Sequence, residues 1–176
     1  GVQTCALPIF TNFGVIEGRY YHEMEFIDGK NIRQIFQKSK EEDKIFPLDS
    51  ACYLMSEVCK GLHYVHTKHD PFTNEPLNII HRDVSPQNII VSYEGEVKIL
   101  DWGIAKAKGK VDETRAGILK GKFGYMSPEQ AEGEELDART DIFSTGVVFY
   151  ELITGERLFV ADNEINTLKK IKECNV

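Results

Sequence analysis

The chain has 176 residues, of which 41% are apolar, and its formal net charge is −7. This is enough apolar material for one globular core. The acidic balance and the lack of a basic run exclude a nucleic-acid groove and argue against contact with an anionic membrane surface. No run of roughly 18 apolar residues occurs, so this segment predicts no membrane-spanning helix.

The cysteines indicate a reducing environment. The chain has four cysteines: Cys5, Cys52, Cys59 and Cys174. They form neither a C-x-x-C pair nor a dense disulfide pattern. Free thiols are therefore expected. We predict a cytoplasmic location, although a full-length parent could be membrane-anchored through a segment that is not present here.

Both ends of the chain are unusual. Residues 1–9, GVQTCALPI, are neither a signal peptide nor a clear structural pattern. They resemble the translation of a common sequencing-adapter oligonucleotide, so we predict an assembly artefact, with a genuine irregular tail as the alternative. The final IKECNV continues an apparent helix without a cap. We expect both ends to be cut.

The first part of the chain predicts a strand and a short helix. Residues 20–26 are rich in aromatics and predict a strand. A turn is expected at Asp28–Gly29. Apolar residues at helical spacing over 32–36 predict an amphipathic helix. The charged stretch 38–44 predicts a solvated loop.

The clearest helix follows. Pro47–Ser50 supplies start signals, and apolar residues then recur at spacings of three and four as far as Val65. His63, His66 and His69 lie near its end. They do not share one helical face, and no carboxylate or cysteine completes a ligand set, so we predict no metal site there.

Residues 88–101, NIIVSYEGEVKILD, predict a β-hairpin that turns at 93–96. The start of its first strand should lie beside the end of its second. Asn88 and Asp101 are therefore expected to meet at the open end, with Asp83 just upstream. Three oxygen-bearing side chains would converge there. A purely structural hairpin with polar ends is the alternative.

The remaining sequence predicts a loop and two helices. Residues 103–122 have little periodicity and predict a loop. Asp137 or Thr140 can begin a helix that is apolar nearly all round and therefore buried, and Gly155 is placed to end it. A second, amphipathic helix is expected over residues 164–174, with its apolar face carried by Ile165, Leu168 and Ile171.

Four short motifs follow one another along the chain, and their order and spacing are informative together. They are HRDVSPQN at 81–88 (the HRD loop), DWG at 101–103, SPE at 127–129, and DARTDIFSTGV around Asp141. Together they resemble the protein kinase family, and in particular the eukaryotic-like serine/threonine kinases of bacteria. The resemblance implies an α+β, protein-kinase-like fold that is partial: the end of the small β lobe plus most of a mainly helical large lobe.

The resemblance also divides the chain. Residues 1–9 stay outside it, residues 10–27 would be the remaining small-lobe strands and the hinge, and residues 28–176 would be the large lobe, truncated before its last helices.

The resemblance implies roles in phosphoryl transfer for residues of the HRD loop and of the hairpin. Asp83 would accept and orient the substrate hydroxyl, while Asn88 and Asp101 would hold Mg²⁺, a cation that prefers oxygen ligands. Arg82 would pair with a phosphate on the loop that follows Asp101. Thr114 is the candidate phosphorylation site, and the equal alternative is that Thr114 is an ordinary loop residue.

The resemblance places adenine at the hinge. Met24 would be the gatekeeper, and the backbones of Glu25 and Ile27 would meet the base. The residues expected to touch ATP are Met24, Glu25, Ile27, Ser85, Asn88, Ile90 and Asp101. Asp141 would brace the HRD loop from the buried helix, and Trp102, in place of the usual Phe of D-F-G, would be a packing variation.

The sequence departs from the family pattern in two ways. It contains no Gly-rich loop, no V-A-I-K lysine and no partner glutamate, so this chain alone should transfer phosphate poorly. Ser85 replaces the lysine of the HRD loop, and Lys122 stands where the family usually has Thr. We hypothesise that Lys122 supplies the missing cation; a substrate-facing surface lysine is the alternative. The expected catalytic set is thus Asp83, Arg82 and Lys122.

Three functions are compatible with this pattern. The first is a serine/threonine protein kinase fragment whose parent transfers the γ-phosphate of ATP to Ser and Thr hydroxyls of protein substrates. The second is a pseudokinase that acts as a binding or scaffold module, which only Ser85 favours. The third is a kinase-like small-molecule phosphotransferase, which the SPE motif and the long segment before it argue against.

Overall fold

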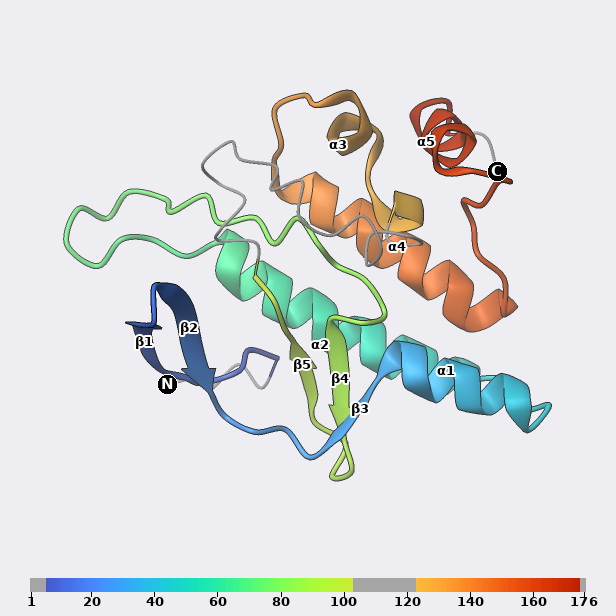
Figure 1. Cartoon of the computed structure of the whole chain (residues 1–176), viewed down its shortest axis with the longest axis horizontal. Helices are drawn as coiled ribbons and strands as arrows, with labels where there is room; N and C mark the ends of the chain where they lie inside the picture. The colour runs from blue at the N-terminus through green and yellow to red at the C-terminus, as the bar shows by residue number, and fades with distance from the viewer. Residues whose placement is uncertain (1–5, 103–122, 175–176) are drawn as a thin grey trace.

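The computed structural model describes residues 6–102 and 123–174. It combines two small sheets with a mainly helical body (Figure 1). The elements in chain order are β1 (Phe10–Ile16), β2 (Arg19–Met24), β3 (Gly29–Asn31), α1 (Ile32–Glu41), α2 (Leu48–His66), β4 (Ile89–Ser92), β5 (Val97–Ile99), a 3₁₀ turn (Phe123–Tyr125), α3 (Pro128–Glu132), α4 (Ala138–Thr154) and α5 (Glu164–Lys172).

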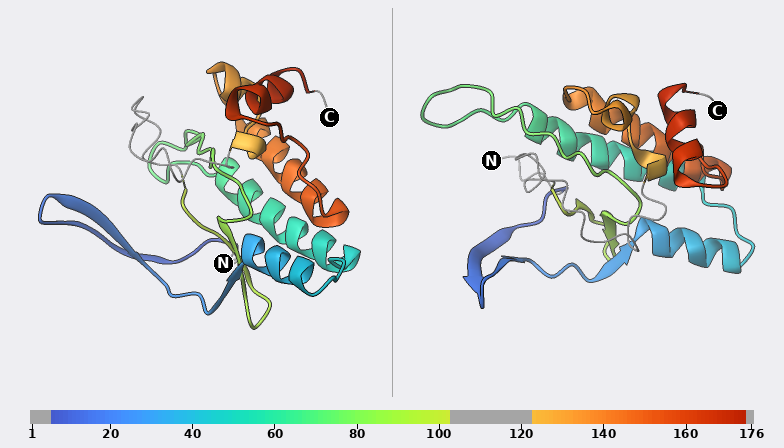
Figure 2. Two further views of the ribbon diagram at one scale, coloured as in Figure 1. Left: turned by 45° about the vertical axis from the view of Figure 1, so that its right-hand side comes forward. Right: turned by 45° about the horizontal axis from the view of Figure 1, so that its top comes forward.

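Strands β1 and β2 form an antiparallel ribbon. Its two turn residues, Glu17 and Gly18, have φ angles of +50° and +75°, as tight hairpins require. The predicted strand over 20–26 is thus confirmed, although it ends at Met24. The ribbon stands away from the helices (Figure 2). Its large apolar side chains are exposed: Phe13, Val15, Ile16, Tyr20 and Tyr21.

Strands β3, β4 and β5 form the second sheet in that order. The predicted turn at Asp28–Gly29 is wrong, because Gly29 begins β3 and pairs with Ser92 of β4. A Cβ atom on residue 29 would lie 2.1 Å from the Val91 carbonyl oxygen, so the close approach of the two strands requires glycine here.

The predicted β4–β5 hairpin is confirmed, with Ile89 opposite Ile99. Beyond that pair, the Leu100 N–H donates to the Asn88 carbonyl over 2.7 Å. The polar ends of the two strands are therefore adjacent, as the sequence pattern predicts.

Helix α1 begins with a capping box in which Asn31 and Gln34 each bond the other's backbone N–H. The charged stretch that predicts a loop from residue 38 is helical as far as Glu41, so that prediction is wrong for its first half. Lysine and glutamate favour helices, and Lys38 pairs with Glu42 one turn later at 3.2 Å.

Helices α2 and α4 pack side by side and form the core together with β5 (Figure 1). The confirmed α2 buries an apolar stripe made of Ala51, Leu54, Met55, Val58, Leu62 and Val65. Helix α4 starts after the Asp137 cap and ends at Gly155, where φ is +77°. It is not buried all round, because Ile142 and Ile153 are 52% and 41% exposed.

Helix α5 packs beside α3. It ends at Lys172 with Glu173 as its C-cap, so the apparent uncapped helix of the sequence does end within the described chain. Ile171 is buried and Leu168 packs against the core, but Ile165 is 78% exposed, so its predicted place on the apolar face is wrong.

The described cysteines are free thiols, as expected: Cys52, Cys59 and Cys174. Within the described ranges, no helix combines the length and apolarity needed to cross a membrane.

Candidate active site

The HRD loop rests on a buried carboxylate. Asp141, in the first turn of α4, is fully buried. Its Oδ1 accepts the Arg82 N–H at 2.8 Å, and its Oδ2 accepts the His81 N–H at 2.8 Å. His66 Nε2 on α2 also donates to Oδ2, at 2.7 Å. These bonds and the helix N-terminus together stabilise a buried negative charge. The predicted brace on the loop backbone is confirmed.

His81 is buried, and its ring connects the loop to the hairpin. Nε2 donates to the Leu100 carbonyl at 2.9 Å, and Nδ1 accepts the Asp83 N–H at 3.2 Å. Burial lowers the pKa of His81, while the Asp141 carboxylate opposes that shift. The pattern of bonds requires the neutral ring, and this ring holds the backbone of Asp83.

The hairpin places Asn88 beside the residue that precedes Asp101, and Asn88 also bonds the backbone of Asp83. Asn88 Nδ2 donates to the Asp83 carbonyl at 2.8 Å, and Asp101 directly follows Leu100, whose N–H bonds Asn88. Asp101 is exposed and has a left-handed φ of +57°. In the described part of the chain, no three His, Cys, Asp or Glu side chains cluster as a metal site.

Trp102 does more than fill space. Its indole Nε1 donates to the Ile99 carbonyl at 3.0 Å, and its ring meets the His81 ring edge-on with centroids 4.5 Å apart. A phenylalanine could pack here but could not donate that hydrogen bond. The interpretation as a packing variation is therefore incomplete.

The segment predicted to be the hinge contacts the same hairpin. Glu25 Oε1 accepts the Ile9 N–H at 2.9 Å and lies 3.1 Å from Lys98 Nζ on β5. The Ile9 hydrogen bond, with help from Lys98 and against a desolvation penalty, lowers the pKa of Glu25. Met24 and Ile27, on either side, are half-buried.

The other expected nucleotide contacts lie on β4 and the HRD loop. Ile90 is half-buried and pairs with Asn31 of β3, the strand that follows the hinge. Ser85 is 1% exposed, and its Oγ has no hydrogen-bond partner among the described residues. Lys122 and Thr114 lie outside the described residues.

A junction beside the HRD loop has no signal in the local sequence. Arg33 Nη1 on α1 lies 3.0 Å from Glu151 Oε1 on α4. The Tyr125 hydroxyl accepts from Arg33 Nη2 and donates to Glu151 Oε2. Burial, with the Glu151 carboxylate, raises the pKa of Tyr125. Three distant segments therefore share one buried hydrogen-bonded group.

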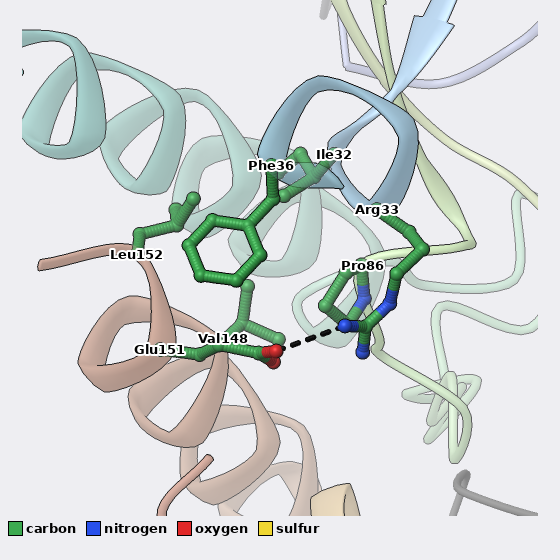
Figure 3. Close-up of a pocket in the computed structure, with 7 residues that line it drawn as sticks. All are labelled: Ile32, Arg33, Phe36, Pro86, Val148, Glu151 and Leu152. Carbon is green, nitrogen blue, oxygen red and sulfur yellow. Dashed lines mark hydrogen bonds and ion pairs between the residues drawn. The ribbon is translucent and has the colours of Figure 1, made fainter. Parts of the chain in front are cut away.

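Figure 3 shows the pocket at this junction, with Pro86 of the HRD loop facing Arg33. It has about 160 Å³ of empty space and is partly open to solvent. Its lining residues are Ile32, Arg33, Phe36, Pro86, Val148, Glu151 and Leu152. The pocket lies where α1, α4 and the HRD loop meet, and the Arg33 N–H donates to the Pro86 carbonyl there at 3.0 Å.

A model of the protein kinase domain matches residues 9–176, so the chain belongs to the protein kinase family. This match confirms the α+β, protein-kinase-like fold that the motifs imply. The relatives described here come from bacteria. The chain is 41% identical to tyrosine-protein kinase MasK of Myxococcus xanthus over 90% of its own residues and 24% of that protein.

Two further relatives are named as serine/threonine kinases. The chain is 36% identical to PknA of Corynebacterium glutamicum, over 81% of its residues and 28% of that protein. It is 36% identical to PknB of Mycobacterium leprae, over 83% of its residues and 22% of that protein. The resemblance to eukaryotic-like bacterial kinases is confirmed, and the chain spans about a quarter of the length of these relatives.

Proposed function

We propose that this chain is part of a serine/threonine protein kinase that transfers the γ-phosphate of ATP to hydroxyls of protein substrates. One observation carries the proposal: the loop that bears Asp83 is held by hydrogen bonds to the buried side chains of Asp141 and His81. Phosphoryl transfer depends chiefly on positioning and on neutralising phosphate charge, and a loop fixed in this way suits that chemistry.

In this proposal Asp83 accepts and orients the substrate hydroxyl. Asn88 and Asp101 hold Mg²⁺, which when bound would neutralise phosphate charge. The donor set fits, since the Asn88 amide nitrogen is already engaged by the Asp83 carbonyl and its oxygen is the ligand type that a hard cation takes. Two protein ligands suffice where substrate phosphates complete the coordination.

The hinge and the sheet would receive the nucleotide. Met24, with the backbones of Glu25 and Ile27, would meet adenine, and Ile90 would contact it from β4. Support comes from the Lys98–Glu25 pair, which fixes the hinge against the hairpin that carries Asp101. Ser85 is the remaining proposed contact with ATP, although its side chain is nearly fully buried in the HRD loop.

Serine and threonine are the proposed acceptors. The tyrosine-specific branch usually carries Arg near the position of Gln87 in the HRD loop, and PknA and PknB are named as serine/threonine kinases. MasK, however, is named as a tyrosine kinase. The acceptor residue is therefore the feature of this proposal that most needs measurement.

We further propose that Lys122 supplies the charge that Ser85 lacks, and that Arg82 pairs with a phosphate on Thr114. The 176 residues alone are expected to be a weak catalyst. Their sequence contains no Gly-rich loop and no V-A-I-K lysine, and the β1–β2 ribbon leaves Phe13, Val15 and Tyr20 exposed.

The test is phosphate transfer from γ-labelled ATP with Mg²⁺ to a general protein substrate, using the full-length protein that carries this domain. Wild type should label the substrate, and Asp83→Asn should not. Asp43→Asn, on an exposed loop, is the matched control and should behave as wild type. Nucleotide binding without Asp83-dependent transfer would instead favour the pseudokinase.

A further inference from the structure

The residue before Asp83 has an uncommon backbone conformation. Arg82 has a φ of +67°, in the left-handed region that non-glycine residues rarely adopt. Such residues persist only where the surrounding structure holds them, and they concentrate at functional sites. The contacts that hold Arg82 therefore fix the direction in which the chain enters Asp83.

Both polar backbone groups of Arg82 are held, each from a different helix. Its N–H donates to Asp141 Oδ1 on α4 at 2.8 Å. Its carbonyl accepts from Gln130 Nε2 on α3 at 2.9 Å. We call these two hydrogen bonds, one from Asp141 and one from Gln130, the clamp on Arg82.

The same Gln130 side chain also starts helix α3. Its Oε1 accepts the Ser127 N–H at 3.1 Å, and its backbone N–H donates to Ser127 Oγ at 3.3 Å. These contacts settle the orientation of the amide, because reversing it would set oxygen against the Arg82 carbonyl and NH₂ against the Ser127 N–H. One amide group thus joins the start of α3 to the HRD loop.

We propose that Gln130 is a positioning residue for the reaction, which rests on the proposed function. It locks the left-handed Arg82 peptide to the segment that ends in the Ser-Pro-Glu motif, and so fixes Asp83 relative to that segment. Gln130 acts through Arg82 and touches neither substrate nor nucleotide.

Gln130→Glu separates the clamp from the helix cap. A glutamate still accepts the Ser127 N–H, since capping boxes use either residue, but it removes the donor to Arg82 and turns a carboxylate oxygen toward that carbonyl. Gln34→Glu is the matched control. Gln34 caps α1 through Asn31 in the same way, and in the described ranges its Nε2 bonds no other segment.

The full-length protein is assayed by steady-state phosphorylation and thermal unfolding. Gln130→Glu should lower kcat by about 10- to 100-fold, as misplacement of a catalytic group does, with KM for ATP nearly unchanged. Its unfolding temperature should match that of Gln34→Glu, which should keep wild-type kcat. If Gln130→Glu proves unstable, Gln130→Met, which is neutral and similar in size, should show the same loss of kcat. An unchanged kcat in folded Gln130→Glu or Gln130→Met contradicts the proposal.

Amide hydrogen exchange tests the clamp independently of catalysis. Exchange across residues 81–83 should speed up in Gln130→Glu and stay unchanged in Gln34→Glu. Equal exchange in the two variants overturns the positioning role. If the wild-type protein transfers no phosphate, the proposed function is overturned instead. The hydrogen-exchange result still decides whether the clamp exists.

Discussion

Asp141 on α4 and His66 on α2 lie 2.7 Å apart, between Oδ2 and Nε2. This contact joins the two core helices directly beneath the HRD loop, and the same carboxylate holds the backbone of His81 and Arg82. The loop is thus anchored to the two packed core helices. Its geometry depends on helix packing as well as on its own sequence.

Replacing Asp141 by alanine should be strongly destabilising. The change leaves two backbone N–H groups and His66 without their acceptor, so the free energy of unfolding should fall by about 3–5 kcal/mol. Urea unfolding of the full-length protein measures this. Asp137→Ala, at the exposed cap of the same helix, should cost only about 1 kcal/mol. Equal losses would show that the Asp141 contacts carry little stability.

The stability of the folded domain should fall as the pH drops below about 6.5. Burial holds the pKa of folded His81 below its ordinary value, so in acid the unfolded chain takes up a proton that the folded state resists. The stability that neutral His81 contributes is thus fully present above the ordinary pKa of histidine. It declines as the pH falls towards the pKa of His81 in the folded state. Unfolding titrations at pH 7.5 and 5.5 measure the loss.

His81→Phe isolates this effect. The variant should be less stable at neutral pH, because the bonds to Leu100 and Asp83 are lost, but its further loss on acidification should be smaller than that of wild type. His63→Phe, at an exposed position on α2, should retain the wild-type acid dependence. An unaltered slope in His81→Phe would assign the acid sensitivity to other groups.

Tyr125→Phe should weaken the junction between α1 and α4. Removing the hydroxyl leaves Glu151 and Arg33 each short of a partner, at a cost of about 1–3 kcal/mol. Tyr53→Phe, at an exposed hydroxyl on α2, should cost far less. Chemical unfolding of the two variants at neutral pH gives the comparison, and similar small losses would contradict the role of the junction.

The cost of Tyr125→Phe should also shrink in alkali. The pKa of folded Tyr125 is raised, so above about pH 10 the unfolded tyrosine ionises while the folded one does not, and the stability that Tyr125 contributes is progressively lost. Comparing variant and wild type at pH 8 and pH 10.5 tests the sign. A cost that grows with pH would reverse the argument.

Lys122→Ala should lower turnover by about 10²–10³-fold if this lysine supplies the charge that Ser85 lacks. Lys120→Ala, two residues away in the same segment, is the control and should change turnover little. Steady-state phosphorylation rates provide the measurement. A wild-type rate in Lys122→Ala would leave Lys122 as a surface lysine.

Local patterns in the sequence predict α1, α2, α4, α5 and the hairpin, because these elements depend on periodicity, caps and turns, whereas the short α3 was missed. The hairpin alone brings Asn88 and Asp101 to adjacent positions. The limits of α1 and the exposure of Ile165 were harder to predict, because polar helix ends have no periodic signal and burial depends on which neighbours are packed against a helix.

Apart from the Asp141 brace, the interactions around the HRD loop were beyond prediction. Arg33 and Glu151 are 118 positions apart, and Gln130 and Arg82 are 48 apart. No local pattern encodes such pairings. Gln130 does stand three residues after Ser127, the spacing of a capping box, so the sequence could have assigned its role in α3 but not its second bond.

The central claim is tested most directly by identifying the phosphorylated amino acid. The full-length protein and its Asp83→Asn variant are incubated with γ-labelled ATP, Mg²⁺ and a substrate that offers serine, threonine and tyrosine, and the hydrolysed product is separated into its phosphoamino acids. Wild type should yield phosphoserine and phosphothreonine, and Asp83→Asn should yield neither. Phosphotyrosine alone, or labelling that persists without Asp83, would contradict the central claim.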